Sequence, residues 1–299
     1  LLHDRVMDSG YQDNPVVGSA LLSMHGRSGE LDRAVEVFDR LRDPGLATYN
    51  AMLTQYVQHG RAMEALDLFK RMKRSAMKPN KVTLINLVEA CSELESLEDG
   101  REIHRWIAAL ELESDLVVGT LLVNMYGSCG STDDARSSFA KIKLKGVSLA
   151  AWNSMLGAYA QTGHDRHRHN QALLFFTEMA QLGVDPDGTT FVCLLNSLTH
   201  SGLLARSRDC FVDMVGEFQI AATSEHYGCV IDLLGRCGRL RQAEELMNTM
   251  PFVPDSMDWT SLLSASTTHS DRGIAEQSAS IAAALDPANS APYVLLSNV

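Results

Sequence analysis

Residues 46–80 read LATYNAMLTQYVQHGRAMEALDLFKRMKRSAMKPN, with one apolar stripe before Gly60 and a second one after it. In both stripes the apolar residues recur at intervals of three and four, which is typical of a helix buried on one face. A glycine between two such stripes suits the left-handed turn that ends a helix. The stretch therefore predicts two helices joined by a tight turn. The first stripe is Tyr49, Met52, Leu53 and Tyr56, and the second is Ala65, Leu66, Leu68, Phe69 and Met72.

The same arrangement recurs along the whole chain about every 35 residues, most often with an alanine five places after the glycine. Glu95 fills one slot in place of glycine, and Gly163 fits if its repeat carries a short insertion. One helical hairpin cannot bury both of its stripes, so the units must stack on one another. We predict an all-α fold, a right-handed α-solenoid of stacked helix-turn-helix repeats. The glycines that share the slot are Gly29, Gly60, Gly130, Gly202 and Gly238.

The composition argues against several other classes of protein. Of 299 residues 45% are hydrophobic, which is enough for a folded core. No apolar run approaches the roughly 18 residues that a membrane span needs, so no membrane partner is predicted. The six cysteines form no C-x-x-C pair, which indicates reduced thiols rather than a disulfide framework or a zinc site. Because the chain starts without Met and ends inside an apolar helical pattern, we expect a piece of a longer protein.

The common catalytic motifs are missing from the sequence. It has no glycine-rich phosphate loop, no G-x-S-x-G elbow and no H-E-x-x-H zinc motif. We therefore expect a chain that is not an enzyme, with no cofactor and no metal. The run from His164 to His169 could hold a metal, but a solvated loop insertion is the favoured interpretation. Trp152, Tyr56 and Tyr159 recur on the apolar face, where core packing is favoured over base stacking.

Three kinds of repeat can be distinguished, and they alternate. Segment 46–80 contains Ala-Thr-Tyr-Asn at 47–50 and ends in Lys-Pro-Asn at 78–80. Segment 81–115 contains Val-Thr-Leu at 82–84 and Gly-Arg-Glu-Ile-His at 100–104, and segment 116–148 contains the run Val118–Tyr126. These segments resemble the P, L and S repeats of the plant organellar pentatricopeptide-repeat proteins, in their PLS subclass. A second triplet follows, and residues 256–289, with Trp259 and Leu285-Asp286-Pro287, resemble the E motif that closes such arrays.

On this resemblance the chain divides into consecutive repeats without a separate globular domain. The predicted segments are the end of an L-type repeat (1–14), an S-type repeat (15–45), a P-type repeat (46–80), an L-type repeat (81–115), an S-type repeat (116–148), a P-type repeat with an insertion (149–187), an L-type repeat (188–223), an S-type repeat (224–255), the E motif (256–289) and the start of a further truncated helical motif (290–299).

The resemblance also implies which residues bind RNA. In the family the fifth and the last residue of a repeat together read one base, through hydrogen bonds to the base edge. Asn with Asn implies a pyrimidine reader and Asn with Asp a uracil reader, because Asn both donates and accepts whereas Asp only accepts. The Thr with Ser pair is less clear and could favour a purine. The predicted RNA-base readers are Asn50 with Asn80, Thr120 with Ser148, and Asn153 with Asp187.

Other repeats depart from this pattern, and one alternative stays open for the readers themselves. Asn is also a common helix cap, so Asn50 and Asn153 could begin a helix instead of reading a base. Their recurrence in one register favours base reading. The pairs that lack a competent reader are Ile85 with Asp115, Val192 with Thr223, Ser19 with Gly45, and Gly228 with Asp255.

The charge distribution predicts weak and salt-sensitive RNA binding for the chain. Its net charge is −11, and segment 81–115 alone, with 3 basic and 9 acidic residues, contributes −6. Segment 46–80, with 6 basic and 2 acidic residues, is instead at +4. The basic residues in its second half are Lys70, Arg71, Lys73, Arg74 and Lys78.

The resemblance implies a sequence-specific adaptor that binds single-stranded organellar RNA, most plausibly to select sites for C-to-U editing in the mitochondrion or chloroplast. The E motif is then expected to contact editing-complex proteins or a cytidine deaminase. The deaminase motifs themselves, H-x-E and P-C-x-x-C, do not occur in these 299 residues. The alternative is a protein-interaction scaffold like the tetratricopeptide repeats, which leaves the P-L-S alternation unexplained.

Overall fold

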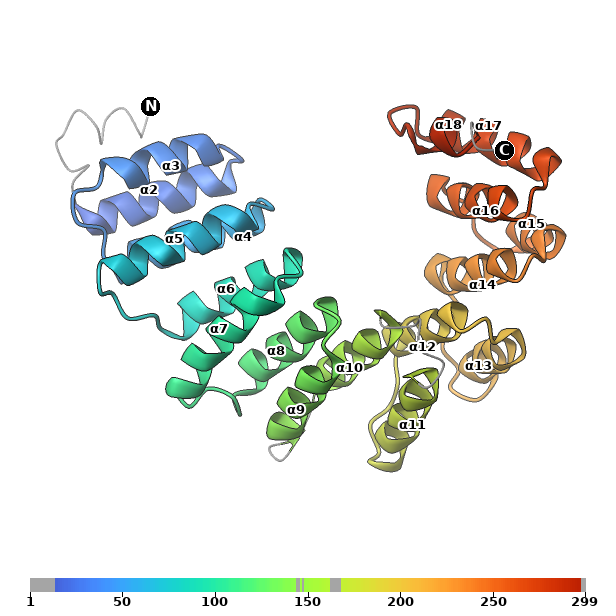
Figure 1. Cartoon of the computed structure of the whole chain (residues 1–299), viewed down its shortest axis with the longest axis horizontal. Coiled ribbons are helices and arrows are strands. Elements are labelled where there is room, and N and C mark those ends of the chain that lie inside the picture. The colour runs from blue at the N-terminus through green and yellow to red at the C-terminus, as the bar shows by residue number, and fades with distance from the viewer. Residues whose placement is uncertain (1–13, 144–145, 147, 162–167, 297–299) are drawn as a thin grey trace. The chain divides into compact units, whose positions relative to one another are not determined.

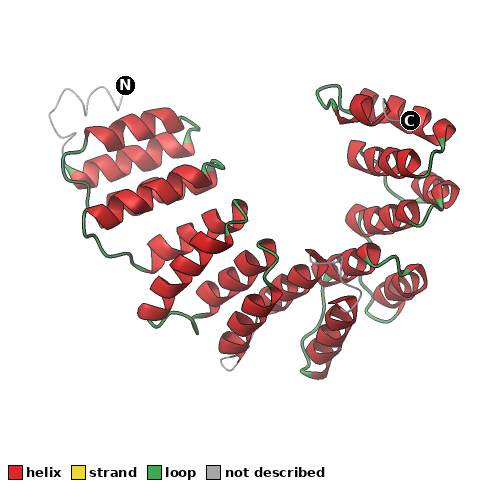
Figure 2. Cartoon of the chain, in the orientation of Figure 1, coloured by secondary structure: helices red, strands yellow, loops and turns green. Residues whose placement is uncertain are grey.

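The computed structural model describes residues 14–143, 146, 148–161 and 168–296, and in this part of the chain it contains helices and no strand (Figures 1 and 2). The chain divides into two compact units, residues 1–158 and residues 159–299. Each unit consists of helical hairpins stacked in sequence order. The prediction of an all-α solenoid of helix-turn-helix repeats is confirmed. None of the helices described is both long and apolar enough to cross a membrane.

In the first unit, the first helices of successive hairpins pack side by side from α2 to α8. The second helices form the other layer and pack against the first helices of their own and the next hairpin. Most of α10 belongs to this unit as well. The first helices are α2 (Pro15–Arg27), α4 (Leu46–Gln58), α6 (Lys81–Glu93), α8 (Leu116–Ser128) and α10 (Leu149–Gln161), and the second helices are α3 (Leu31–Arg40), α5 (Ala62–Arg74), α7 (Leu97–Ala109) and α9 (Thr132–Lys143).

The second unit repeats the same two-layer arrangement, with α12, α14, α16 and α18 stacked as one layer. The helices of this layer are α12 (Gly188–His200), α14 (Ser224–Arg236), α16 (Ser256–Thr268) and α18 (Ala291–Leu296). Those of the other layer are α11 (Arg168–Gln181), α13 (Leu204–Gly216), α15 (Leu240–Thr249) and α17 (Arg272–Leu285). First helices thus begin at residues 46, 81, 116, 149, 188, 224 and 256, while the assignment of the segments to three repeat types stays a prediction.

The turn between the two helices of a hairpin has the left-handed backbone that the repeated glycine predicts. Gly60 has a φ of +67°, and the four other glycines of this slot also have positive φ. Glu95, which replaces the glycine in one repeat, is held at a φ of +51°. Such a conformation brings Cβ close to the backbone and is costly for residues other than glycine. Gly163 and most of the insertion that follows it lie outside the described residues.

Replacing Glu95 by glycine should therefore stabilise the protein. Relief of the left-handed strain, about 1–2 kcal/mol, outweighs the extra backbone entropy of glycine, about 0.5–1 kcal/mol. We expect a higher midpoint of chemical unfolding for Glu95→Gly, measured by circular dichroism. Glu93→Gly is the matched control, since Glu93 is an exposed residue at the end of α6 and has no positive φ. A midpoint that drops in both variants would contradict this argument.

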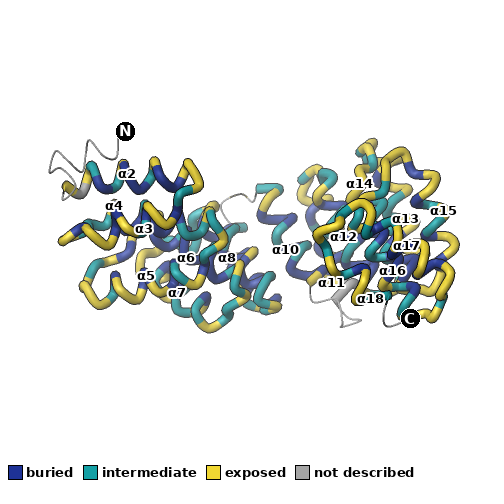
Figure 3. The backbone as a smooth tube through the Cα atoms, turned by 90° about the horizontal axis from the view of Figure 1, so that it is seen from above, coloured by how far each residue is buried: buried dark blue, intermediate teal, exposed yellow. Residues whose placement is uncertain are grey.

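The core of each unit consists of the buried apolar stripes of its two layers of helices. Figure 3 shows these buried positions in dark blue along the backbone of both units. The small residue and the large residue of the repeat, Ala65 and Phe69, are 0% and 3% exposed. The aromatic residues Trp152 and Tyr159 are both 1% exposed, which confirms their expected place in the core. Tyr56 is half-buried.

A close approach between first helices was not expected from the sequence. Gly127 of α8 lies so near Ala158 of α10 that a Cβ added to the glycine would be 2.8 Å from the alanine Cβ. Gly235 of α14 stands in the same relation to Ala265 of α16, also at 2.8 Å. Both glycines are the twelfth residue of their helix, so the absence of a side chain there sets the spacing of the helices.

Candidate nucleic-acid interface

Every predicted reader has a defined place at the start of a first helix. The residue predicted to end each repeat lies immediately before the next first helix, and for most of these helices it is the N-cap residue. The residue predicted as fifth is the fifth residue of the helix itself, inside the second turn. In chain order, the fifth residues are Ser19, Asn50, Ile85, Thr120, Asn153, Val192 and Gly228, and the residues that precede the next helix are Gly45, Asn80, Asp115, Ser148, Asp187, Thr223 and Asp255.

Asn50 and Asn80 are in direct contact. The Asn50 Nδ2 group donates a hydrogen bond to Asn80 Oδ1 over 3.1 Å, although the two residues are 30 positions apart. The Thr83 hydroxyl lies 2.7 Å from Asn50 Oδ1 and 3.0 Å from Asn80 Oδ1. Asn50 is 9% exposed, whereas Asn80 lies at the surface. The three side chains form one polar cluster, the Asn50–Asn80–Thr83 cluster, where two successive repeats meet.

Helix capping fixes the orientation of the Asn80 amide. Asn80 Oδ1 accepts from the Thr83 backbone N–H at 3.0 Å, and the Thr83 hydroxyl accepts from the Asn80 N–H at 3.1 Å, so the two residues form a capping box. An N-cap side chain must present its oxygen to the helix. The Asn80 Nδ2 group therefore faces away, with two N–H donors free for a ligand. Thr83 has an essential part in this geometry that the sequence reasoning overlooked, although the Asn-x-x-Thr spacing is a recognisable capping signal.

The alternative interpretation of Asn50 as a helix cap is wrong. The N-cap of α4 is Gly45, five residues earlier. Asn153 is likewise the fifth residue of α10 and cannot begin that helix. The other member of each pair is the residue that caps a helix: Asn80 caps α6, and Asp187 caps α12. The cap explains why these last positions, apart from Gly45, carry Asn, Asp, Ser or Thr even in repeats without a polar fifth residue.

Thr120 and Ser148 are not joined by a hydrogen bond. The Thr120 hydroxyl donates to the Leu116 carbonyl at 2.7 Å, one turn back in its own helix. Ser148 Oγ lies 3.4 Å from the Ala151 N–H, a long capping contact. The Thr120 side chain is half-buried and, with its only proton engaged, can offer a ligand an acceptor.

Asn153 belongs to the first unit and Asp187 to the second. Asn153 is 9% exposed, the same value as Asn50 at the equivalent position. Asp187 caps α12 by accepting from the Thr190 backbone N–H at 2.9 Å, and the Thr190 hydroxyl is 3.0 Å from the same oxygen. Asp187 and Thr190 thus repeat the capping geometry of Asn80 and Thr83. The pairing of Asn153 with Asp187 stays a prediction.

Asp115 is engaged by its neighbour. Lys81 Nζ lies 2.7 Å from Asp115 Oδ2, and this ammonium holds the pKa of the carboxyl below its usual range. The carboxylate also caps α8 by accepting from the Val118 N–H at 3.1 Å. Asp115 thus holds an ion pair and a helix cap, and the poor base reading expected of this repeat, with apolar Ile85 as its fifth residue, stays a prediction.

Exposed apolar side chains stand beside the readers, and the sequence reasoning did not single them out. Val82 is the second residue of α6 and 49% exposed, and Val117 is the second residue of α8 and 54% exposed. Met257 has the same place in α16 and is 70% exposed. Residues two and five lie on one face of a helix, because three positions make nearly one turn. In the sequence, these residues could have been recognised because they are apolar but lie outside the buried apolar stripe of their helix.

The basic residues of segment 46–80 are less available than the sequence suggests. Four of the six are ion-paired, Arg61 just before α5 with Glu64 and three others on α5 itself, in the layer of second helices, while Arg74 and Lys78 have no ion pair with any described residue. The pairs from α5, with their N–O distances, are Lys70–Asp67 (2.8 Å), Arg71–Asp39 (3.0 Å) and Lys73–Glu102 (2.6 Å). The first helices α4, α8 and α10 carry no charged side chain at all. The helices that carry Asn50, Thr120 and Asn153 are therefore uncharged, and the charged groups near the readers, such as Lys81 and Asp187, lie at or beside the N-caps of α6 and α12.

The cysteines are expected to differ widely in reactivity. Burial raises the pKa of Cys91 to about 12 and that of Cys193 to about 11, whereas Cys237 is exposed. Since the thiolate is the reactive form, Cys237 should be labelled by a thiol reagent about tenfold faster or more than the buried cysteines at pH 8. Stopped-flow labelling of the native chain checks this, and Cys237→Ser should remove the fast phase. A fast phase that survives the substitution would contradict it.

No group of three or more His, Cys, Asp or Glu suited to a metal ion occurs among the residues with described positions. The run from His164 to His169 lies outside the described part of the chain: this applies to the backbone of residues 164–167 and to the side chains of Arg168 and His169.

Comparison with known proteins identifies the repeats. The model of the PPR repeat family matches residues 44–93, and that of the PPR repeat matches residues 19–46 and 225–251. A chloroplastic pentatricopeptide repeat-containing protein of Arabidopsis thaliana is 36% identical over 298 residues, covering 100% of this chain and 36% of the relative. A mitochondrial one from the same plant is 35% identical over 301 residues, covering 100% and 45%. These relatives support the expected organellar location, and the chain spans less than half of their length.

Among solved structures, the pentatricopeptide repeat protein PPR10 in complex with an 18-nt psaJ RNA element is similar in fold. The TM-score is 0.79 at 18% identity, over 98% of this chain and 43% of PPR10. PPR10 from maize matches with a TM-score of 0.67 over 98% of this chain and 42% of PPR10. The repeat matches fall in both units, and relatives align along the full length. The chain is accordingly similar to pentatricopeptide repeat-containing proteins along its whole length, and residues 19–93 and 225–251 match the models of the repeat itself.

Proposed function

We propose that this chain is a sequence-specific adaptor that binds single-stranded RNA, with one base contacted by each competent repeat. The observation that carries the proposal is the Asn50–Asn80–Thr83 cluster. It places a buried amide and an exposed amide next to each other and leaves hydrogen-bond donors unused. The similarity in fold to a protein solved with an 18-nt RNA element supports the same conclusion.

The hydrogen bonds within the cluster predict the base that it prefers. Asn80 Oδ1 is occupied by Asn50 and Thr83, so the pair offers mainly N–H groups to a ligand. Cytosine presents two adjacent acceptors, N3 and O2, whereas uracil places an N3–H donor between its two carbonyl groups. A surface rich in donors therefore suits cytosine better than uracil. This narrows the expected pyrimidine preference of Asn50 with Asn80 to cytosine.

The other two predicted pairs offer different chemistry. Asp187 has no donor, so with Asn153 it can accept the N3–H of uracil, as the resemblance implies. Thr120, whose proton is bonded to the Leu116 carbonyl, offers an acceptor, and the Ser148 hydroxyl can still donate, while the expected purine rests on the resemblance. We infer that the exposed residues Val82 and Val117 contact the flat faces of bases, since apolar contact with a base is tolerant of sequence.

We further propose that the RNA is an organellar transcript and that the bound site is one for C-to-U editing. The P-L-S alternation and the E motif at residues 256–289, which forms α16 and α17, support this finer assignment by resemblance. In this proposal the E motif recruits editing-complex proteins or a cytidine deaminase, and the chain itself performs no chemistry. A tetratricopeptide-like scaffold is the alternative, and it predicts no base preference.

Selection from a library of short single-stranded RNAs tests the proposal. We expect the wild-type chain to enrich RNAs with cytosine at one position, and Asn50→Ala to lose that enrichment. Thr54→Ala is the matched control, because Thr54 lies one turn further along α4 and bonds only to the Asn50 carbonyl. No enrichment by the wild-type chain would favour the scaffold, and enrichment that survives Asn50→Ala would reject the cluster as a reader.

A further inference from the structure

Two equivalent grooves occur in the chain, each beside the second helix of a predicted L-type repeat. The first lies along α7, with a volume of about 730 Å³, and the second along α13, with about 570 Å³. Corresponding wall residues are 107 positions apart (204 − 97). These pairs are Leu97 and Leu204, Arg101 and Arg208, His104 and Phe211, and Arg105 and Val212.

Polar contacts within the chain form one wall of the first groove. His104 lies 2.7 Å from the Tyr126 hydroxyl through Nδ1 and 3.0 Å from Glu113 through Nε2. Lys141 pairs with the same glutamate. Burial lowers the pKa of His104, against the opposing effect of Glu113, so the neutral ring with Nε2–H donating to the glutamate is favoured. The polar groups of this groove thus satisfy one another.

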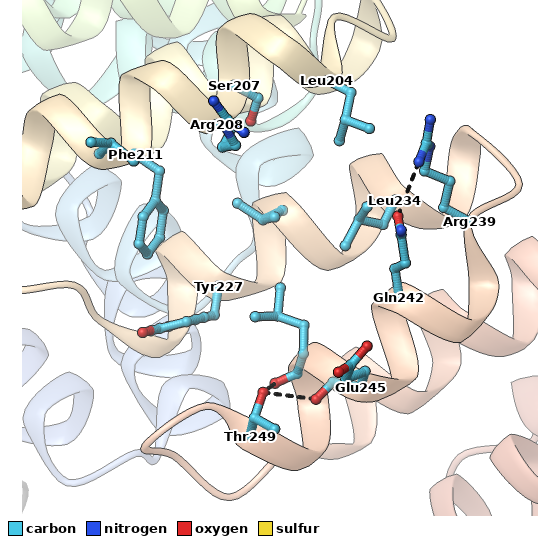
Figure 4. Close-up of a pocket in the computed structure, with 13 residues that line it drawn as sticks. Leu204, Ser207, Arg208, Phe211, Tyr227, Leu234, Arg239, Gln242, Glu245 and Thr249 are labelled. Atoms are coloured by element: carbon cyan, nitrogen blue, oxygen red, sulfur yellow. Dashed lines mark hydrogen bonds between the residues drawn. The ribbon is translucent and has the colours of Figure 1, made fainter.

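In the second groove, Phe211 takes the place of His104 and Val212 that of Arg105. The hydrogen bonds that His104 makes in the first groove therefore have no counterpart at Phe211. Phe211 packs edge-on against Tyr227 at 5.3 Å between ring centroids, and Tyr227 lies 5.9 Å from Phe252. Val212 is 59% exposed and Val253, beyond Phe252, is 89% exposed. Figure 4 shows Phe211 and Tyr227 at one end and Leu204, Leu234 and Arg239 at the other. The result is an apolar channel open to solvent.

A buried hydroxyl in this wall lacks a partner. Ser207 is 1% exposed and lines the groove, and its Oγ makes no hydrogen bond with any residue in the described part of the chain. Other repeats have alanine at this position, as in Ala65 and Ala243. Unpaired hydroxyls of the same kind occur at Ser138 and Ser278, so this one marks a polar atom in the wall of the groove and no ligand is inferred from it.

The shape of the groove fits a helix. Leu204, Arg208 and Phe211 recur on one face of α13, and Gln242, Leu246 and Thr249 on one face of α15. Two parallel rows of helical side chains leave between them the kind of furrow that receives the ridge of a third helix. Three charged side chains line the groove, Arg208, Arg239 and Glu245, so that the basic ones outnumber the acidic one. Arg208 is 82% exposed with only its neighbour Asp209 at 3.7 Å, and Arg239 contacts neutral Gln242 at 3.3 Å.

We propose that the groove along α13 docks an acidic amphipathic helix of a partner protein. Its apolar face would cover Phe211, Val212 and Leu246, and its carboxylates would face Arg208 and Arg239. The equivalent groove along α7 does not take such a helix, because its wall carries His104 and Arg105 in place of apolar residues and is lined by Glu98 and Glu113, which repel carboxylates. The site is separate from the Asn50–Asn80–Thr83 cluster and does not depend on RNA binding.

The probe is a fluorescein-labelled 16-residue peptide designed as a helix, with leucines on one face and glutamates flanking them, and the measurement is anisotropy. Val212→Glu and Arg208→Glu should each weaken binding about tenfold or more. Arg105→Glu, at the equivalent place in the first groove, is the matched control and should bind as the wild type does. A peptide with lysines in place of the glutamates should bind at least tenfold more weakly.

Several results would overturn the proposal. These are no binding of the acidic peptide by the wild-type chain, equal binding of the lysine peptide, or an equal loss in Arg105→Glu. Displacement of the peptide by single-stranded RNA would assign the groove to the RNA surface instead. Circular dichroism of each variant shows whether it is folded, and Val212 is exposed enough for its substitution to leave the core intact.

Discussion

Asn80→Asp should change the preferred base at one RNA position from cytosine to uracil. The aspartate keeps the role of N-cap, since Asp and Asn cap equally well, and it still accepts from the Thr83 N–H and from Asn50. What it loses is the exposed Nδ2 group with its two donors. The pair then presents acceptors, which repel cytosine N3 and accept the N3–H of uracil.

The expected size of the change follows from the value of a good contact to a base edge, about 1–3 kcal/mol of discrimination. A change of about 1.4 kcal/mol is tenfold in the dissociation constant. Anisotropy with RNAs that differ by one cytosine or uracil, scanned along the strand, would measure it. Low salt is needed, because few unpaired cations lie near the readers.

Asp115→Asn is the matched control for this exchange. It makes the reverse change at another N-cap, where the fifth residue is apolar Ile85 and the carboxylate is bound to Lys81. Base preference should stay as in the wild type. If Asp115→Asn altered the preference as much as Asn80→Asp, or if Asn80→Asp left it unaltered, the proposed register of readers would be wrong.

Gly127→Val should strongly destabilise the first unit. A Cβ at this position would lie 2.8 Å from the Ala158 Cβ and 3.1 Å from its Cα, and backbone atoms cannot move aside as a flexible side chain can. Overpacking of this kind costs about 1–3 kcal/mol, and a β-branched residue adds further atoms at the same place. We expect a loss at the upper end of that range, or local unfolding of the α8–α10 contact.

Gly216→Ala provides the contrast, since Gly216 is helical, at the end of α13, and nothing lies within 4 Å of an added Cβ. That variant should gain about 0.5–1 kcal/mol, the usual advantage of alanine over glycine in a helix. Urea unfolding followed by circular dichroism measures both. Gly235→Val, at the equivalent place in the second unit, should lose as much as Gly127→Val. Equal midpoints for Gly127→Val and Gly216→Ala would refute the packing argument.

The fold was predictable from the amino-acid sequence because its causes are local and repeated. Two stripes around Gly60 predict a hairpin, and the recurrence of the pattern predicts a stack, since each hairpin exposes a face that only its neighbours can cover. The left-handed turn at Gly60 follows from backbone geometry alone, as does the strain at Glu95 in the same slot. The positions of Asn50 and Asn80 at opposite ends of a repeat could be named from the register.

Their interaction could not be derived from the sequence, because it depends on how one hairpin sits on the next. Thirty residues separate Asn50 from Asn80, and only the stacking of α4 on α6 brings the two amides and Thr83 within hydrogen-bond distance. The role of the twelfth-position glycines depends on the same stacking. The need for glycine at position 127 arises only because Ala158 of the next first helix packs against it. Local periodicity determines that helices form and pair, whereas the distance between packed helices, set by the side chains that meet, determines which polar groups can act together.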